Sequence, residues 1–262
     1  MKTTYYNWCP LYIIKTIKSI TIVLWILTAI VLYQYVSTNE LSTIIWFVIV
    51  LISACIALFM YVRFTYMYHV FDFDNKNGVS WKIIHFVSDH MQLEPNSKIL
   101  DVGCGSGALT IDVAKKNRGS SIVGCDRWGK DYKDFSKNVC LHNADVEGVN
   151  NITFVQGDAT HLPFKDNEFD GLVSNYVYHN IPGNRTSYLV ESLRCLKPGG
   201  KFAIHDIFIK AKYGDLDQVI KVLKENGVKE LKFIDTTDGT CMTIEQATKT
   251  FCKGSKLLVG HK

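Results

Sequence analysis

The sequence predicts a doubly wound α/β domain that follows a hairpin of two membrane-spanning helices. Short apolar runs, separated by segments of helical or loop length, recur at 98–102, 121–125, 152–155, 169–174 and 201–207. This alternation is typical of parallel strands joined by right-handed crossovers. The first run ends in a glycine-rich turn, where open α/β sheets bind ligands. Nearer the N-terminus, residues 19–36 and 41–62 contain no charged side chain.

The two charge-free segments are long enough to cross a bilayer. At 1.5 Å per residue they form helices of roughly 27 and 33 Å, close to the thickness of a hydrocarbon core. Residues 37–40 between them allow only an antiparallel hairpin, so we expect a membrane anchor over residues 1–63 that contacts the lipid bilayer. A cleaved signal peptide is the alternative for the first segment, but its apolar region is too long and no small-residue cleavage site is evident. A buried core hairpin is the other alternative, although core helices are usually shorter.

Basic residues flank this hairpin and are missing from its tip. Lys2, Lys15 and Lys18 precede the first segment and Arg63 follows the second, whereas the tip carries only Glu40. The positive-inside rule therefore places both ends of the hairpin in the cytoplasm. We expect an integral membrane protein whose α/β domain faces the cytoplasm.

Composition narrows the classes of partner and ligand. The net charge of +4 is modest and no run of lysine or arginine occurs, so nothing indicates a nucleic-acid partner. The spacing of the eight cysteines includes no C-x-x-C, and one cysteine lies inside a predicted span. We therefore expect no metal site and no disulfide framework, but free thiols in a reducing compartment.

Residues 64–95 form a connector between the predicted anchor and the α/β domain. A polar cluster, DFDNKNG, interrupts the chain, and VSWKIIHFVSDHMQL then predicts an amphipathic helix. Its apolar stripe consists of Val79, Ile83, Val87 and Met91. We expect this stripe to pack on the sheet; alternatively, Trp81 and Phe86 contact the membrane surface or cover a ligand pocket.

The segment ILDVGCGSGALT, residues 99–110, is the most informative part of the chain. An apolar strand ends in an acid and opens into three glycines, which adopt positive φ easily and let a ligand approach the backbone. Gly103, Gly105 and Ala108 satisfy the dinucleotide pattern G-x-G-x-x-G/A, with Asp126 as a ribose acid. However, Asp101 places a carboxylate where a cationic group could bind, whereas a dinucleotide loop must admit an anionic pyrophosphate.

This segment resembles the first motif of the class I S-adenosylmethionine-dependent methyltransferases, LDVGCGSG. The segments SIVGCD, NITFVQGDATHLPFKDNEFD, GLVSNYVYHNI and LRCLKPGGKFAIHDI follow in the order that the family shows. The sequences of these motifs are similar to those of the ubiquinone, menaquinone and small-molecule methyltransferase subgroup. The resemblance implies a Rossmann-like seven-stranded sheet over residues 96–262, with the last strand antiparallel and residues 229–237 and 255–261 as its final two strands.

The resemblance also implies which residues bind S-adenosyl-L-methionine, the methyl donor. Asp126 accepts the ribose hydroxyls, Asp158 and Ala159 flank the adenine, and Asn175 closes the pocket after the fourth strand. The residues assigned to the methionine part and its loop are Asp101, Gly103, Cys104, Gly105 and Gly107, and Arg127 is placed beside Asp126. From the residues alone, Asp126 ends a β-prone run and so falls at the ligand-binding edge, although a helix N-cap or a turn acid has the same appearance. The Gly-Asp pair at 157–158 also suits an ordinary turn.

Methyl transfer from a sulfonium mainly requires alignment, and a general base only where the acceptor must lose a proton. The candidate base is His179, with Tyr176 as a second catalytic candidate, since both follow the fourth strand. The alternative for each is a packing role, as for Tyr178. His205 and Asp206, at the end of the fifth strand, form a second candidate pair for proton transfer.

These observations predict a membrane-anchored methyltransferase acting on a small lipophilic acceptor, such as an isoprenoid quinone, a lipid headgroup, a sterol-like ring or a hydrophobic thiol. A catalytically silent, membrane-tethered scaffold of the same fold is one alternative, and an NAD(P)-dependent oxidoreductase is the other. The sequence leaves the acceptor, the methylated atom and the oligomeric state open.

Overall fold

A computed structural model describes the chain except for residues 1, 6, 8, 77 and 130–134. The chain forms two compact units. One is Asn7–Asp72, and the other combines Met1–Tyr6 with Phe73–Lys262. The boundary therefore falls at residue 72, and the first residues of the chain belong to the same unit as the α/β domain. This differs from the expected division, in which residues 1–63 form the anchor and residues 64–95 a separate connector.

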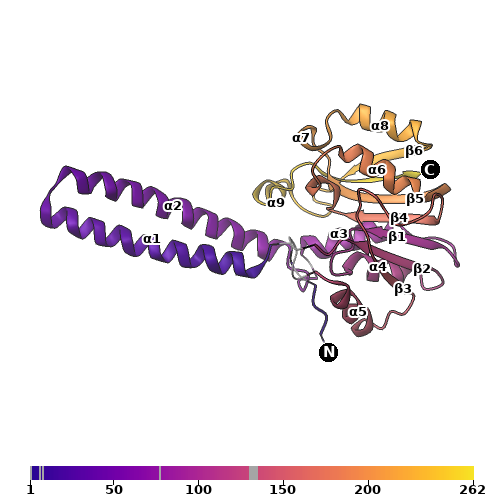
Figure 1. Cartoon of the computed structure of the whole chain (residues 1–262), viewed down its shortest axis with the longest axis horizontal. Helices are drawn as coiled ribbons and strands as arrows, with labels where there is room; N and C mark the ends of the chain where they lie inside the picture. The colour runs from indigo at the N-terminus through magenta and orange to yellow at the C-terminus, as the bar shows by residue number, and fades with distance from the viewer. Residues whose placement is uncertain (1, 6, 8, 77, 130–134) are drawn as a thin grey trace. The chain divides into compact units, whose positions relative to one another are not determined.

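The smaller unit is an antiparallel pair of long helices, α1 (Leu11–Thr38) and α2 (Leu41–Val70) (Figure 1). Asn39, with a φ of 51°, ends α1, and Glu40 directly precedes α2. Both helices are long and apolar enough to cross a membrane, and only 11% of the most apolar window of each is buried. Such exposure is unlike that of a core hairpin in a soluble protein.

The larger unit is built on a seven-stranded sheet with the order β3-β2-β1-β4-β5-β7-β6. The strands are β1 (Lys98–Val102), β2 (Ser121–Asp126), β3 (Ile152–Gln156), β4 (Phe169–Asn175), β5 (Leu196–Ile207), β6 (Glu230–Asp235) and β7 (Ser255–His261). β7 lies between β5 and β6 and runs antiparallel to both, whereas the other strand pairs are parallel. The predicted fold class is confirmed. β5 is longer than the expected 201–207, with an irregular register against β4 between Phe169 and Gly171.

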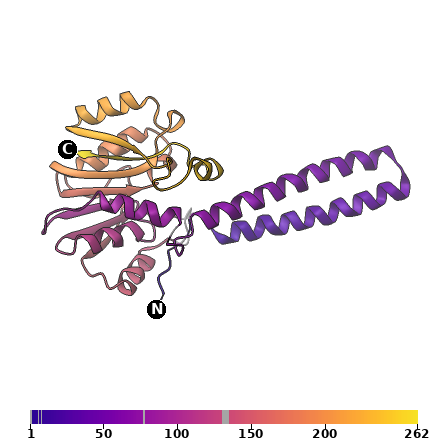
Figure 2. The ribbon, with the colours of Figure 1, turned by 180° about the vertical axis from the view of Figure 1, so that it is seen from behind.

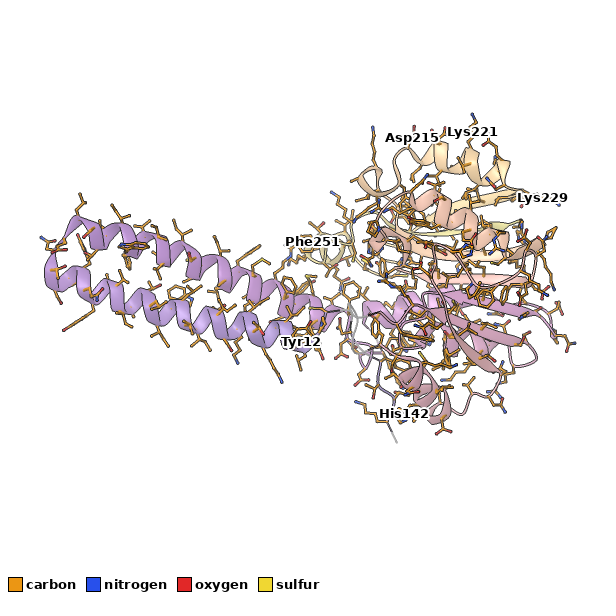
Figure 3. The ribbon with its side chains drawn as sticks, viewed as in Figure 1. Tyr12, His142, Asp215, Lys221, Lys229 and Phe251 are labelled. Carbon is orange, nitrogen blue, oxygen red and sulfur yellow. The ribbon has the colours of Figure 1, made fainter. Side chains whose placement is uncertain are left out.

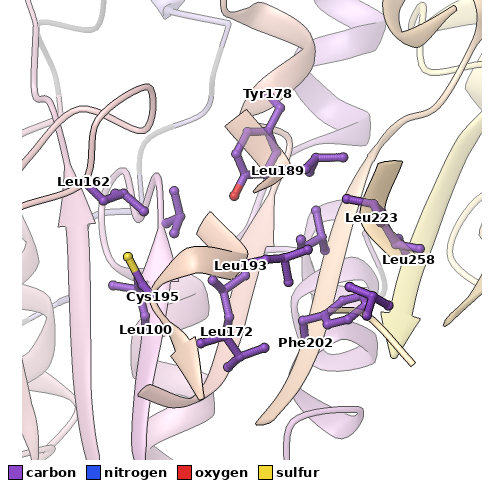
Figure 4. Close-up of a cluster of buried hydrophobic side chains, with 14 of the residues drawn as sticks. Leu100, Leu162, Leu172, Tyr178, Leu189, Leu193, Cys195, Phe202, Leu223 and Leu258 are labelled. Carbon is purple, nitrogen blue, oxygen red and sulfur yellow. The ribbon is translucent and has the colours of Figure 1, made fainter. Parts of the chain in front are cut away.

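Helices cover both faces of this sheet (Figures 1 and 2). They are α3 (Val79–Asp89), α4 (Ala108–Lys116), α5 (Lys137–Val146), η2 (Tyr178–Asn180), α6 (Arg185–Arg194), α7 (Lys210–Tyr213), α8 (Leu216–Glu225) and α9 (Ile244–Lys249). Because successive strand residues point to opposite faces, Leu100 packs with Leu189 and Leu193 of α6, whereas Asp101 bonds to Thr110 of α4. Figure 4 shows the cluster on the α6 side.

α3 packs as its apolar stripe predicts. Val79, Ile83 and Val87 are buried, and so is Met91 beyond the end of the helix. The Met91 sulfur lies 2.7 Å from the position that a Cβ on Gly171 of β4 would take. The structure therefore confirms that the apolar stripe of α3 packs on the sheet.

Candidate functional site

The candidate site lies at the switch point of the sheet, between β1 and β4. β1 and β4 are neighbours, but the chain leaves β1 toward β2 on one side and leaves β4 toward β5 on the other. The loops after two such strands diverge, and open α/β sheets bind ligands in the resulting crevice. In this chain the two loops are the glycine loop, residues 103–107, and the segment 175–180. They touch, because a Cβ on Gly103 would lie 2.2 Å from Cγ2 of Val177.

The glycine loop has the backbone that its composition predicts. Gly103, Gly105 and Gly107 have φ values of 74°, 56° and 87°, a region that other residues enter only at a cost. Gly107 is also the N-cap residue of α4. The N–H groups of Gly103 and Cys104 both donate to the carbonyl of Cys125 in β2, at 2.7 and 3.1 Å. The loop is thereby held to β2 as well as to β1.

Asp101 lies beneath the glycine loop and not on its surface. Its side chain is 1% exposed, and Oδ2 accepts a hydrogen bond of 2.6 Å from the Thr110 hydroxyl. Oδ1 is buried with no hydrogen-bond partner among the described residues. Burial raises the pKa of this carboxyl to about 7, and the neighbouring Asp126 adds to the effect. An unpartnered buried acceptor beneath a loop of glycines fits a ligand that carries positive charge.

Asp126 joins the end of β2 to the glycine loop. Its Oδ2 accepts from Gly105 N at 2.9 Å and its Oδ1 from Trp128 N at 2.8 Å. The Trp128 indole in turn donates to the Gly105 carbonyl at 3.0 Å. Asp126 caps none of the described helices, because Ser136 caps α5, and its bond to the N–H two residues later is that of a turn acid. Each carboxylate oxygen keeps a further lone pair, which suits a ligand with two adjacent hydroxyls.

Asp158 and Arg127 lie close to Asp126. The Gly157 N–H donates to the Asp126 carbonyl at 3.0 Å, which brings the segment after β3 to the end of β2. Oδ1 of Asp158 accepts from the backbone and the hydroxyl of Thr160, and these bonds, with the nearby charge of Arg127, lower its pKa. Ala159 packs against the main hydrophobic cluster. The structure therefore brings together the residues assigned to the ribose and the adenine.

Asn175 ends β4 and contacts a buried histidine. Its Oδ1 lies 2.9 Å from Nδ1 of His205, whose Nε2 lies 2.9 Å from the Thr236 hydroxyl. His205 is 0% exposed, and burial lowers its pKa to about 3. A histidine that stays neutral at physiological pH is unsuited to act as an acid. The expected pairing of His205 with Asp206 does not form, because the two side chains bond to different partners.

Asp206 pairs instead with His179. The Nδ1–H of His179 donates to Oδ1 of Asp206, and its backbone N–H donates to Oδ2 at 3.0 Å. Asp206 is fully buried and also accepts from the Tyr213 hydroxyl at 2.8 Å and from Ile207 N at 2.7 Å. The side chain of His179 remains 12% exposed. A carboxylate on Nδ1 fixes the ring orientation and leaves Nε2 with the free lone pair.

Tyr176 and Tyr178, in the segment after β4, each form a hydrogen bond between the phenol and a serine hydroxyl. Tyr176, with a φ of 55°, lies with its hydroxyl 2.8 Å from Ser255 Oγ, and burial raises its pKa. Its ring lies edge-on to those of His179 and His205, with centroids 5.7 and 4.6 Å away. Tyr178 is fully buried, as its packing alternative predicts. Tyr176 therefore supports the two histidines by packing, and its phenol stays protonated.

Known proteins resemble this chain over the same region. Residues 100–204 match the family model described as a methyltransferase domain. The chain is 30% identical over 132 residues to a sterol 24-C-methyltransferase of Yarrowia lipolytica, covering 50% of this chain and 33% of that protein. It is 38% identical over 116 residues to a demethylmenaquinone methyltransferase of Staphylococcus carnosus, covering 44% of each. The ubiquinone/menaquinone biosynthesis C-methyltransferase of Rickettsia prowazekii is 35% identical over 135 residues, 50% of this chain and 52% of that one.

Solved structures agree on the fold. A phosphoethanolamine N-methyltransferase of Haemonchus contortus, in complex with phosphomonomethylethanolamine and S-adenosylhomocysteine, superposes with a TM-score of 0.53 at 16% identity, over 71% of this chain and 53% of that one. The [4+2]-cyclase SpnF superposes with a TM-score of 0.52 at 18% identity, over 69% and 80%. That protein is named for a different reaction, so the fold alone does not give the chemistry.

These findings identify residues 100–204 of the larger unit as a methyltransferase domain of class I, the S-adenosylmethionine-dependent type. The dinucleotide interpretation of the glycine loop is therefore set aside. The chain spans about a third to a half of the length of the curated relatives that it matches.

Proposed function

We propose that the chain is a membrane-anchored methyltransferase that transfers a methyl group to a small lipophilic acceptor. One observation carries the proposal: a methyltransferase domain shares its chain with two long apolar helices whose side chains are mostly exposed. Relatives named for sterols and menaquinones support a lipophilic acceptor. A domain tethered at a bilayer meets such acceptors where they are dissolved.

The division of the chain supports an even number of membrane crossings. Met1–Tyr6 and Phe73–Lys262 belong to one folded unit, so both ends of the intervening segment must lie on the same side of any membrane. Lys2 ahead of α1, Lys15 and Lys18 in the first turns of α1, and Arg63 near the C-terminal end of α2 favour the cytoplasm for that side by the positive-inside rule. In this proposal α1 and α2 form the anchor.

In this proposal, different residues of the crevice bind different parts of S-adenosylmethionine. Asp126 binds the ribose diol, Asp158 and Ala159 flank the base, and the glycine loop admits the methionine part above the buried carboxyl of Asp101. Cys104 is a small buried residue of that loop, and Asn175 closes the crevice through its contact with His205. When bound, S-adenosylmethionine supplies a methyl group that its sulfonium already activates.

His179 is the proposed general base. Its Nε2 takes the proton that a hydroxyl or similar acceptor loses, while Asp206 holds the ring and stabilises the charged form. Val177, two residues earlier, touches Gly103, so His179 lies on the segment that borders the glycine loop. Tyr176 fixes the ring from the side.

The test uses membranes that contain the full-length protein and methyl-labelled S-adenosylmethionine. Organic extraction should recover label in the lipid and small-molecule fraction, and Asp126→Asn should abolish it. Label confined to protein would contradict the lipophilic acceptor. Binding of S-adenosylhomocysteine without any transfer from a broad set of membrane lipids and quinones would favour the silent scaffold.

A further inference from the structure

Residues 2–5, which we call the strap, pack on the methyltransferase domain. Thr4 N donates to Oδ1 of Asn143 in α5 at 2.7 Å, and Nδ2 of Asn143 donates back to the Thr4 carbonyl at 2.9 Å. Lys2 forms an ion pair of 2.6 Å with Asp74, and its carbonyl lies 3.2 Å from Nε2 of His142, labelled on α5 in Figure 3. The strap therefore follows α5 through both backbone and side-chain bonds.

Asn143 connects the strap to the glycine loop. Its side chain is 0% exposed, and Nδ2 donates a second hydrogen bond, of 2.9 Å, to the carbonyl of Ser106. Ser106 stands between Gly105 and Gly107, two of the positive-φ glycines. Both amide hydrogens and the amide oxygen of Asn143 are thus used, and one side chain holds two segments that are distant in the sequence.

Apolar contacts join the same two segments. Tyr5 packs against a buried cluster that includes Cys104 of the glycine loop and Phe154 of β3. Cζ of Phe154 lies 3.3 Å from the position that a Cβ on Gly107 would take. The Tyr5 hydroxyl donates to Glu147, directly after α5, at 3.3 Å, and the centroid of the Tyr5 ring lies 4.5 Å from that of Phe73.

We propose that Asn143 is a positioning residue for the glycine loop and that the strap acts through it, so that residues ahead of the apolar helices complete the S-adenosylmethionine site. This inference rests on the proposed role of the glycine loop in cofactor binding. Glycines lose the most backbone freedom when they are ordered, so a ligand binds more weakly to a loop that it must itself order. Asn143 fixes the Ser106 carbonyl before the ligand arrives.

Asn117 provides a matched control for Asn143. It is also buried, at 4% exposure, and its Nδ2 donates to the carbonyls of Met91 and Val113, both at 2.8 Å, while its Oδ1 accepts from Leu93 N at 2.9 Å. The two asparagines therefore make the same number and kind of bonds to backbone groups. Only Asn143 bonds to the glycine loop.

The experiment measures the dissociation constant of S-adenosylhomocysteine by calorimetry on the full chain in nanodiscs. Asn143→Ala should raise it about tenfold, since one buried hydrogen bond contributes on the order of 1.4 kcal/mol. Asn117→Ala should lower the melting temperature to a similar extent but change the constant by less than about twofold. Equal effects of the two variants on binding would show a merely structural role and overturn the proposal.

The strap is tested by Thr4→Pro, which removes one N–H donor and leaves the domain intact. It should raise the dissociation constant about threefold, and it should add nothing to Asn143→Ala in the double variant. Additive effects, or no effect of Thr4→Pro, would contradict a strap that acts through Asn143. A wild-type chain that binds no S-adenosylhomocysteine would instead refute the cofactor site itself.

Discussion

Two hydrogen bonds join His179, which follows β4, to Asp206, which lies near the end of β5. The backbone N–H of His179 donates to Oδ2 at 3.0 Å, while its Nδ1–H donates to Oδ1. Tyr213 donates to the same carboxylate at 2.8 Å, so Asp206 is held from a third direction. Ring orientation and tautomer are thereby set together, with Nε2 left for the acceptor.

Removing this imidazole should affect turnover more than binding. We expect His179→Ala to lower kcat by about 100-fold or more, the usual effect of losing a general base, with the dissociation constant of S-adenosylhomocysteine little changed. The neighbouring Asn180→Ala is the control, because Asn180 is exposed. Label transfer and calorimetry on both variants give the comparison, and unchanged turnover in His179→Ala would remove His179 from the site.

A methyl group on Gly103 should close the crevice. At a φ of 74° the new Cβ would lie 2.2 Å from Cγ2 of Val177, so Gly103→Ala should weaken S-adenosylhomocysteine binding by about tenfold or more. Gly148→Ala isolates the backbone cost, since Gly148 has a φ of 65° and no atom within 4 Å of the added carbon. That variant should lose roughly 1–2 kcal/mol of stability and no affinity.

Partial rescue provides a second check on this contact. Val177→Ala removes the two methyl groups nearest to the new carbon, so it should recover part of the affinity lost in Gly103→Ala. The double variant is measured with the two single variants in one cycle. Strictly additive losses would mean that the contact between the two loops does not determine binding.

Asp101 should make the binding of a cationic ligand depend on pH. Burial raises its pKa to about 7, so the carboxyl is mostly protonated at about pH 6 and mostly ionised at about pH 8. A sulfonium favours the ionised form, so affinity for S-adenosylmethionine should rise across this range and binding should release a proton. Calorimetry in buffers of different ionisation enthalpy measures that proton. The neutral product S-adenosylhomocysteine and the variant Asp101→Asn should both show a weaker dependence.

His205 should destabilise the fold in acid. Its pKa falls from 6.5 to about 3 on burial, so between these values the unfolded chain binds a proton that the folded chain does not. Stability from this group is complete above about pH 6.5 and declines by about 1.4 kcal/mol per pH unit below it. Urea unfolding of the wild type and of His205→Gln, taken at several pH values, isolates the effect as the difference in slope. Parallel curves would show that His205 is not buried in its neutral form.

The strands and the glycine loop could be predicted because their signals are local. Short apolar runs and a strand that ends in Asp101 before three glycines appear directly in the sequence, and β7 spans the predicted 255–261. The apolar windows also predicted α1 and α2, although both helices continue beyond them because a helix does not end where its composition becomes polar. Within the first window, the hydroxyls of Thr21 and Thr28 donate to the carbonyls four residues earlier, both at 2.8 Å.

Long-range pairings could not be predicted in this way. The sequence places His205 beside Asp206, but adjacent strand residues point to opposite faces, so each finds a different partner. The strap was missed for a similar reason. Residues 2–5 carry no periodicity, and their bonds are largely backbone bonds to a helix that begins at Lys137. Asn143 is a polar residue on the buried face of α5, which indicates that it has a hydrogen-bond partner. The sequence does not show that this partner is the strap.

The bond between Thr4 and Asn143 spans 139 residues, with α1 and α2 lying between its ends. Because a chain is synthesised from its N-terminus, residues 2–5 emerge long before the helix that receives them. Closing so large a loop is slow compared with forming local structure. This link can therefore form only after α1, α2 and the chain as far as α5 have been synthesised. Asn143 can hold the strap to the glycine loop only after both long helices have left the ribosome.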